Sequence, residues 1–494
     1  MSDSKVYNDY FFDEPIFDLH DGGYIPLEKA DVKDQPLNIP AVIKPDKVDG
    51  NDVYYTITAQ EGETQILPGK KTKTWGYNAS LLGQTIIFKQ GVHYHIHLVN
   101  KLSEVTTFHW HGLNVTGPVV DGGPHAPVYP DGSRDIDFTL DQPAQTDWLH
   151  PHPCPNTARQ VWNGLAAAVV VTDDEEAKLP FPRNYGVDDI PVILQDRSYH
   201  DNQLDYKADY DVDGTLGKYA LVNGTINGVF NVTTQRVRLR MLNGSDRREW
   251  RLHFDDNHEF TQIASDGGTL PEPVKFTKLM LTCAERAEVI VDFGDKKPGD
   301  VVTLMTDDMP IMKFKIGEFA KDDTKLPEHL TTIDAPKVTP GLPVTRTVMS
   351  GMDDQVRLDG KLFDMQRIDR KQKVGDTVLW DVVNTNDMDG GMIHPFHMHG
   401  CQFLVLSRNG KEPYPNEHGW KDTVGVNAGE TVRIAVQFTK FGVYMYHCHI
   451  LEHEDTGMMA QIEAYDPNHE HKYHLISMDE MNHPKISKID NFFD

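Results

Sequence analysis

Short runs of alternating or β-branched apolar residues recur along the chain, and Gly, Pro, Asn or Asp residues bound each run. Runs of this length and composition are typical of β-strands. Long stretches with the 3.6-residue period of an amphipathic helix are hard to find. In the first third of the chain, the pattern predicts strands at residues 53–59, 74–77, 84–89, 92–99, 106–111, 134–140 and 165–171.

Similar runs continue to the C-terminal third. The middle of the chain has predicted strands at residues 191–199, 236–242, 251–254, 278–281, 287–293 and 301–306. The last third has them at 345–349, 377–383, 403–406, 431–438 and 442–447. A polar, Pro-marked passage at 317–343 separates these two groups and is interpreted as an interdomain linker.

The density of strands predicts an all-β fold of three consecutive β-sandwiches. A length of 494 residues agrees with three domains of roughly 100–200 residues each. We place the domains at residues 51–175, 176–316 and 344–494. Residues 1–50 have no sustained period but carry aromatic side chains near their start, so we expect an extended arm packed on the first domain.

The net charge of −27 argues against a nucleic-acid partner, because nucleic-acid binding requires a basic surface. The chain has no run of 18 apolar residues, so no membrane span is expected. Its first residues lack the basic and apolar segments of a signal peptide. We therefore expect a cytoplasmic protein, unless the sequence begins after the processing of an exported one, and nothing requires more than a monomer.

Four cysteines in so long a chain do not indicate a disulfide framework. Cys154, Cys283 and Cys401 are predicted to be free and mostly buried. Cys448 is different, because it stands in the segment H-C-H-x3-H-x4-M at residues 447–458. Its thiolate, His453 and Met458 offer the sulfur, nitrogen and weak axial sulfur donors of a blue-copper electron-transfer centre.

His447 and His449 flank Cys448. On an extended strand their side chains point away from that of Cys448, so they can bind a metal on the opposite side. One peptide segment would then contact two metal sites. The alternative interpretation is a buried cysteine among surface histidines.

The pattern H-x-H occurs seven times, which is far more often than the His content predicts. His93, His95 and His97 alternate with apolar residues inside a predicted strand, which is typical of a half-solvated sheet face. The histidines of residues 469–474 lie in a polar tail and are interpreted as surface residues. The remaining pairs lie at strand ends or in Pro-flanked turns, where two imidazoles can face one or two adjacent metals.

Four motifs carry a resemblance to a known family. They are H-W-H-G at 109–112, H-P-H at 150–152, H-P-F-H-M-H-G at 394–400 and H-C-H-x3-H-x4-M at 447–458. In this order they resemble the multicopper oxidases, specifically the three-domain branch of bacterial laccases, bilirubin oxidases and cuprous oxidases. The resemblance covers about residues 50–465 and implies three cupredoxin-like Greek-key domains.

The resemblance also implies four copper ions with a complete set of ligands. A type 1 copper would be held by His394, Cys448 and His453, with Met458 as its axial ligand. A type 2 copper would be held by His109 and His397. A type 3 pair would be held by His111, His150, His152, His399, His447 and His449. All these ligands come from the first and third domains, so we interpret the middle domain as a spacer.

The resemblance further implies that an electron from the substrate enters through the edge of the His453 imidazole. It continues through Cys448 to His447 and His449, where dioxygen is reduced to water. Glu454 and Asp121 match acidic positions that assist dioxygen reduction in the family. The alternative for each is a solvated or hydrogen-bonded loop carboxylate.

The reducing substrate is predicted from weaker signals. We expect a laccase-like oxidation of phenols or aromatic amines, with bilirubin oxidation and Cu(I) oxidation as alternatives. The Met-rich insert of cuprous oxidases is missing, and donors for Cu(I) are limited to Met349, Met352, Asp353, Asp354, Met388, Asp389 and Met392. A copper-binding or structural protein without turnover is the hypothesis of a different class.

Overall fold

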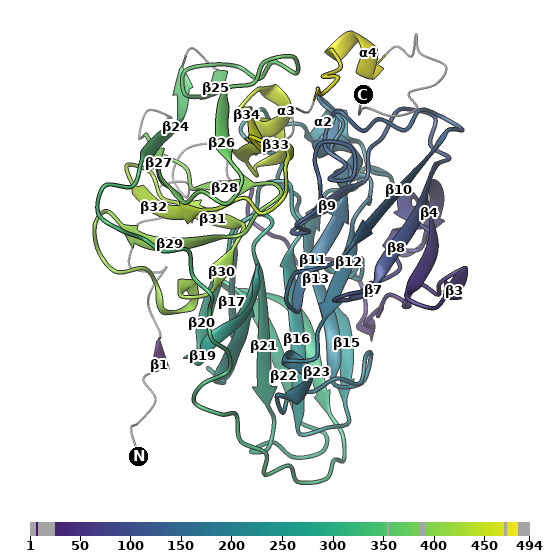
Figure 1. The fold of residues 1–494 in the computed structure, drawn as a ribbon. Helices are drawn as coiled ribbons and strands as arrows, with labels where there is room; N and C mark the ends of the chain where they lie inside the picture. Colours follow the sequence, from purple (N-terminus) through teal and green to yellow (C-terminus); the bar gives the residue numbers. More distant parts are fainter. Residues whose placement is uncertain (1–5, 8–24, 353–354, 386–390, 469–471, 483–494) are drawn as a thin grey trace.

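The computed structural model describes residues 6–7, 25–352, 355–385, 391–468 and 472–482. In these residues six β-sheets account for the fold, and they occur in three pairs along the chain. Figure 1 shows the first pair in purple and blue, the middle pair in teal and the third in green and yellow. The predicted all-β fold of three consecutive sandwiches is confirmed.

The first pair combines a six-stranded and a four-stranded sheet. The six-stranded sheet has the order β10-β8-β4-β5-β6, with β3 beside β4, and the other sheet has the order β7-β12-β11-β9. The bounds are β3 (Lys47–Asp49), β4 (Asp52–Thr64), β5 (Thr72–Tyr77), β6 (Leu82–Gly83), β7 (Ile86–Lys89), β8 (His93–Asn100), β9 (His109–His111), β10 (Ser133–Thr139), β11 (Gln145–His150) and β12 (Ala167–Thr172).

The middle pair has a seven-stranded sheet in the order β1-β19-β18-β21-β16-β13-β14 and a six-stranded sheet in the order β2-β15-β23-β22-β17-β20. The bounds are β1 (Val6–Tyr7), β2 (Gln35–Pro36), β13 (Asp189–Arg197), β14 (Tyr219–Val222), β15 (Gly228–Val232), β16 (Arg236–Asn243), β17 (Trp250–Phe254), β18 (Phe260–Ser265), β19 (Gly268–Phe276), β20 (Lys278–Leu281), β21 (Arg286–Asp292), β22 (Val301–Thr306) and β23 (Met309–Ile316).

The third pair has a six-stranded sheet in the order β25-β24-β27-β32-β29-β30 and a five-stranded sheet in the order β26-β34-β33-β28-β31. The bounds are β24 (Val344–Met352), β25 (Gln355–Leu358), β26 (Arg370–Lys373), β27 (Val378–Asn384), β28 (His394–Met398), β29 (Phe403–Arg408), β30 (Trp420–Lys421), β31 (Thr423–Val426), β32 (Thr431–Val436), β33 (Gly442–Cys448) and β34 (Met459–Tyr465).

The helices among the described residues are short. They are α1 (Thr157–Trp162), α2 (Tyr206–Asp209), α3 (Leu451–Thr456) and α4 (Met478–Asn482), with single 3-10 turns η2 (Glu176–Lys178) and η3 (Pro415–Glu417). None of these helices is long and apolar enough to cross a membrane. Every predicted strand overlaps an observed one, but α3 lies in the metal-ligand segment and was not predicted.

Each pair of sheets encloses its own apolar core, and the strand patterns show why. Along β8 buried and half-exposed residues alternate, so one face of the strand packs inward and the other meets solvent. All nine residues of β13 are buried, which is expected where a strand is covered on both faces. A smaller apolar cluster around Trp148 and Leu242 joins the first pair to the middle pair.

The N-terminal arm runs mainly along the middle pair, which corrects the expectation that it packs on the first domain. Strand β2 pairs with β15, and Leu37 belongs to the middle core. The last part of the arm does pack on the first pair, because Ile43 belongs to the first core and β3 pairs with β4. Tyr10, Phe11, Phe12 and Phe17, which suggested the packing, lie outside the described residues.

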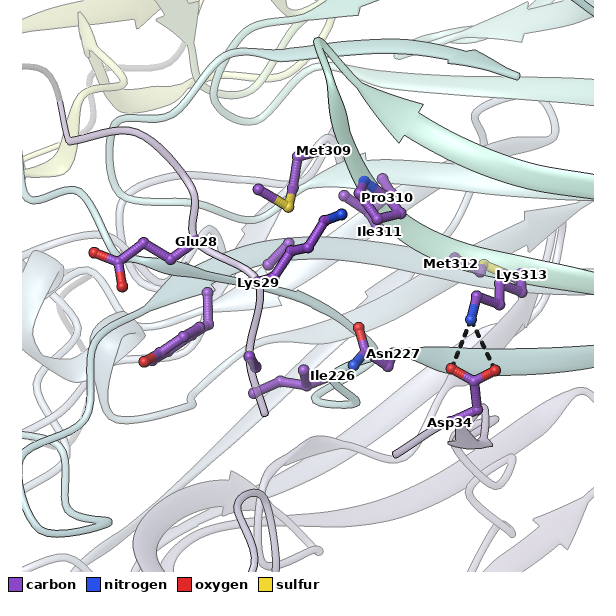
Figure 2. A pocket seen from close by; sticks show the side chains of 13 residues that line it. Glu28, Lys29, Asp34, Ile226, Asn227, Met309, Pro310, Ile311, Met312 and Lys313 are labelled. Carbon is purple, nitrogen blue, oxygen red and sulfur yellow. Dashed lines mark hydrogen bonds and ion pairs between the residues drawn. The ribbon is translucent and has the colours of Figure 1, made fainter. Parts of the chain in front are cut away.

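The arm also lines a cavity of about 240 Å³ together with β14, β23 and the turn that precedes β15. Figure 2 shows Lys313 directed at Asp34 across its edge, where Nζ lies 2.7 and 2.8 Å from the two carboxylate oxygens. None of the predicted copper ligands lines this cavity. It is therefore separate from the predicted metal centres.

Cys154, Cys283 and Cys401 are buried and free, as predicted. Cys154 packs with Met445 and Met459 in a small apolar cluster. Burial raises the pKa of all three thiols above the ordinary value. They are therefore protonated, apolar packing groups at neutral pH.

Candidate metal centres

Cys448 ends strand β33 and lies in a fully buried group with His394 and His453. Its Sγ is 3.3 Å from Nδ1 of His394 and 3.7 Å from Nδ1 of His453. The three donor atoms lie within 4.8 Å of one another. His394 opens the adjacent strand β28, whereas His453 comes from α3, so a strand pair and a helix build this group together.

Met458 follows directly after α3 and is fully buried in the same apolar cluster as Cys448. Gly457, with a φ of 126°, ends the helix and lets the chain turn back. The carbonyl of Met458 then accepts a hydrogen bond of 3.1 Å from the Cys448 amide. The predicted axial residue is thus held beside the predicted thiolate ligand.

Eight further histidines meet at the interface between the first and third pairs of sheets. In the first pair His109 lies opposite His150 in the register of β9 and β11. In the third pair His397 lies opposite His447 in the register of β28 and β33. The eight residues are at most 1% exposed, and they are His109, His111, His150, His152, His397, His399, His447 and His449.

These imidazoles form overlapping groups of three in which the donor atoms lie within 4.8 Å of one another. The groups are His109, His111 and His397; His111, His150 and His449; and His152, His399 and His447. The last two divide the six residues predicted for the type 3 pair, and the first contains both residues predicted for type 2 copper. The grouping agrees with the one that the resemblance implies, except that His111 belongs to two of the three groups.

The second nitrogen of several rings is already engaged, which is the usual arrangement of a metal-binding histidine. Nδ1 of His109, His150 and His397 donates to a backbone carbonyl at 2.8, 2.9 and 2.8 Å. Nε2 of each ring is buried without a hydrogen-bond partner. A buried polar atom without a partner destabilises the fold unless something binds it, so these atoms suit a metal ion.

Burial also sets the protonation state of the donors. It lowers the pKa of His447 to about 3 and lowers the pKa of six of the other seven imidazoles well below the ordinary value. At neutral pH these rings are uncharged and can donate a lone pair to a metal. Burial raises the pKa of the Cys448 thiol, and a bound cation reverses that preference.

Both predicted acids are buried and contact predicted ligands. Asp121 Oδ2 is 2.9 Å from Nδ1 of His399 and 3.5 Å from Nδ1 of His109. Glu454 Oε1 is 3.2 Å from Nδ1 of His152, and its Oε2 is 3.3 Å from Nδ1 of His447. Burial rules out a solvated carboxylate for both residues. Asp121 is hydrogen-bonded to His399, whereas both oxygens of Glu454 are buried without a hydrogen-bond partner.

Sequence reasoning missed Asp422, whose Oδ1 lies 3.1 Å from Nε2 of His111. Arg286, in β21 of the middle pair, donates to both oxygens of Asp422 at 2.6 Å. It also donates to Asp147 at 3.0 Å. The side chains of Asp422, Arg286 and Asp147 are all fully buried. The available signal in the sequence was a charged residue, Arg286, immediately before an apolar predicted strand, because charged residues are rarely buried without a partner.

The middle pair supplies none of the predicted ligands but does more than separate its neighbours. Besides Arg286, it holds α3, because the Tyr206 hydroxyl donates to Glu452 at 3.0 Å. From the first pair, the Thr157 and Ala158 amides donate to Asp455 at 3.0 and 2.9 Å. The helix that carries His453 and Glu454 is therefore fixed from both sides.

The residues considered for Cu(I) do not form an exposed group in the described chain. Met349 and Met392 are buried in the third core. Asp353, Asp354, Met388 and Asp389 lie outside the described residues, as does the side chain of Met352.

Profiles of known families match the whole length of this arrangement. Three profiles described as multicopper oxidase match residues 58–176, 188–314 and 337–468. The multicopper oxidase mco of Staphylococcus aureus is 41% identical over 432 residues, which is 87% of this chain and 92% of that protein.

Two further comparisons differ in what they suggest. A crystal structure of a laccase from Pediococcus acidilactici has a TM-score of 0.92 and 66% identity, and it covers 94% of this chain and 100% of that one. The cell division protein FtsP of Salmonella typhimurium is 31% identical over 463 residues, which is 89% of this chain and 95% of that protein. Similar chains thus include proteins named for oxidation and one named for cell division.

Proposed function

The chain belongs to the multicopper oxidase family, and from this we propose that it couples one-electron oxidations of phenols or aromatic amines to the reduction of dioxygen to water. One observation carries the proposal. The Cys448 group and two of the three-histidine groups meet in a single peptide segment, because His447 and His449 are the direct neighbours of Cys448.

We propose four copper ions for these donors: one at the Cys448 group and three among the eight imidazoles. Copper supplies the one-electron redox chemistry that dioxygen reduction requires. The unpartnered ring nitrogens, the thiol and the low pKa values of the imidazoles all suit this ion.

The protein residues have distinct roles in this proposal. Cys448 and its two peptide bonds provide a covalent path between the two kinds of centre. The carbonyls that accept from Nδ1 of His109, His150 and His397 orient those rings. Glu454 and Asp121 transfer protons to the imidazole cluster in this proposal, since their carboxyl groups contact the rings.

The two candidate methionines whose side chains the structure describes favour an aromatic reductant over Cu(I). A Cu(I) site that exchanges with solvent needs accessible thioethers, but Met349 and Met392 are packed in the core. The similar structure named as a laccase supports the same choice. Cu(I) and bilirubin are the alternative reductants. Because a relative is named as a cell division protein, a copper-binding or structural protein without turnover is the alternative of another class.

The test is dioxygen uptake by the copper-loaded protein with 2,6-dimethoxyphenol, bilirubin and Cu(I) in parallel, with copper-free protein as the control. The proposal expects the fastest uptake with the phenol. Faster uptake with Cu(I) or bilirubin would replace the substrate assignment but keep the oxidase. Absence of uptake with all three would overturn the enzymatic function.

A further inference from the structure

The outer face of the first six-stranded sheet carries a second group of histidines. His93, His95 and His97 of β8 are two residues apart, so their side chains share the half-exposed face of the strand. The neighbouring strands place acidic residues beside them: Asp52 of β4 lies opposite His93, and Asp137 of β10 lies opposite His95. Figure 1 shows the three strands side by side, away from α3 and β33.

The side chains in this group are already oriented toward one another. His95 Nε2 lies 2.8 Å from Asp52 Oδ1, and His93 Nε2 lies 3.6 Å from Asp137 Oδ2. The rings of His93 and His95 meet edge to face, with 4.6 Å between their centroids. Tyr54 stacks on His95 at 4.4 Å and limits the rotation of that ring.

The donor atoms of Asp52, His93 and His95 lie within 4.8 Å of one another. Donors at 2.0–2.2 Å from a tetrahedral ion are about 3.3–3.6 Å apart, so side-chain rotations that bring these donors roughly 1 Å closer would let all three reach one ion. The side chains of His93 and His95 are 30% and 33% exposed, which leaves an open route from solvent. The net charge of −27 further favours a cation.

We propose that Asp52, His93 and His95 bind a divalent transition-metal ion on the protein surface, separately from the copper centres. Two imidazole nitrogens and one carboxylate oxygen are the donors that Zn²⁺ and Cu²⁺ prefer. Asp137 or water completes the coordination. The bound ion joins β4 to β8 and replaces the hydrogen bond between Asp52 and His95.

A matched control exists in the same chain. His200 Nε2 lies 2.8 Å from Asp209 Oδ1, and this exposed pair repeats the contact between His95 and Asp52. His200 belongs to none of the three-donor groups described above. It therefore offers one imidazole and one carboxylate without the second imidazole on which the proposed site depends.

The experiment is isothermal titration of the copper-loaded protein with Zn²⁺, which has no redox chemistry of its own. The unmodified protein and His200→Gln should each take up one Zn²⁺ per chain. The double variant His93→Gln/His95→Gln should lose this uptake. Asp52→Asn removes a direct ligand, so it should weaken binding by at least the roughly tenfold that is typical of losing a group that only supports a ligand. Circular dichroism of every variant checks that the fold is intact.

X-ray anomalous scattering at the zinc edge then locates the ion. Density between Asp52, His93 and His95 is the expected result. Uptake by the double variant equal to that of the unmodified protein overturns the proposal, as does loss of uptake in His200→Gln. Zn²⁺ located elsewhere, or no uptake by the unmodified protein, overturns it as well.

Discussion

Two groups of histidines in this molecule share the same spacing and have opposite surroundings. The spacing H-x-H occurs in both groups: in His93, His95 and His97, and in His447 and His449. The first three are half-exposed, whereas the other two are fully buried. Spacing therefore places imidazoles on a shared or opposite face, but burial and hydrogen-bond partners decide what they can bind.

The partners of the two groups differ as well. On the exposed face each ring contacts the carboxylate of a neighbouring strand, as His97 contacts Asp135 at 2.7 Å. In the buried group several rings donate to backbone carbonyls and keep a second nitrogen without a partner. A ring of the second kind holds a metal tightly because no water competes for the nitrogen.

The largest effect is expected from matched substitutions in the two groups. His397→Gln removes an imidazole from the buried cluster. Loss of a residue that only hydrogen-bonds a metal ligand typically lowers activity by roughly 10–100-fold, so loss of a ligand itself should lower the rate of dioxygen uptake further. His97→Gln, on the exposed face and outside the proposed zinc site, should leave uptake unchanged. Equal losses in the two variants would break the comparison.

The next effect concerns stability. Arg286→Met leaves the buried carboxylates of Asp422 and Asp147 without their guanidinium partner, so the free energy of unfolding should fall by about 3–5 kcal/mol. Urea unfolding followed by circular dichroism measures it. As a control, Arg433→Met breaks the partly exposed ion pair with Asp381 and should lower the free energy of unfolding by about 1 kcal/mol or less. A similar loss in both variants would contradict the interpretation.

A smaller effect is expected at Glu454, whose carboxylate contacts His152 and His447. Glu454→Gln keeps the shape but removes the exchangeable carboxyl proton, so turnover should fall about 100-fold while the copper content stays intact. Oxygen-electrode rates and atomic absorption give the two values. Glu175→Gln, an exposed change in the first pair of sheets, is the control. Normal turnover of the Glu454 variant refutes the proton role.

The smallest change is expected at Met458. Met458→Leu removes a weak thioether donor near Cys448, so the reduction potential of that centre should rise while the blue colour remains. A redox titration of the visible absorption measures it. Met459→Leu serves as the control, since the next residue packs in a different apolar cluster, with Cys154. An unchanged or lower potential in the Met458 variant would be contrary to prediction.

The fold was largely predictable because alternation of apolar and polar residues marks a strand that packs on one face. The pattern identified β8 and β16 almost to the residue. It missed β11 and β28, since their sequences mix Trp or Phe with the metal-site histidines instead of alternating. It also missed α3, whose six residues are too few to show a helical period.

The side chains that form the buried groups were predictable because each motif keeps its His, Cys and Met residues within a few positions. Asp422 and Arg286 were not, since they are 136 residues apart and meet only when the middle and third pairs of sheets pack together. No spacing rule connects such residues. The same applies to Asp52 and His95, which are 43 residues apart and are joined by the pairing of β4 with β8.

The buried cluster can form only late in biosynthesis. His152 and His447 face each other at 3.3 Å across 295 residues of chain, so these rings can meet only after the ribosome has synthesised the chain beyond His447. A chain that ends before residue 394 carries only four of the eight imidazoles, because the other four belong to the third pair of sheets. In the proposed enzyme, such a chain would lack half of the ligands for the buried coppers.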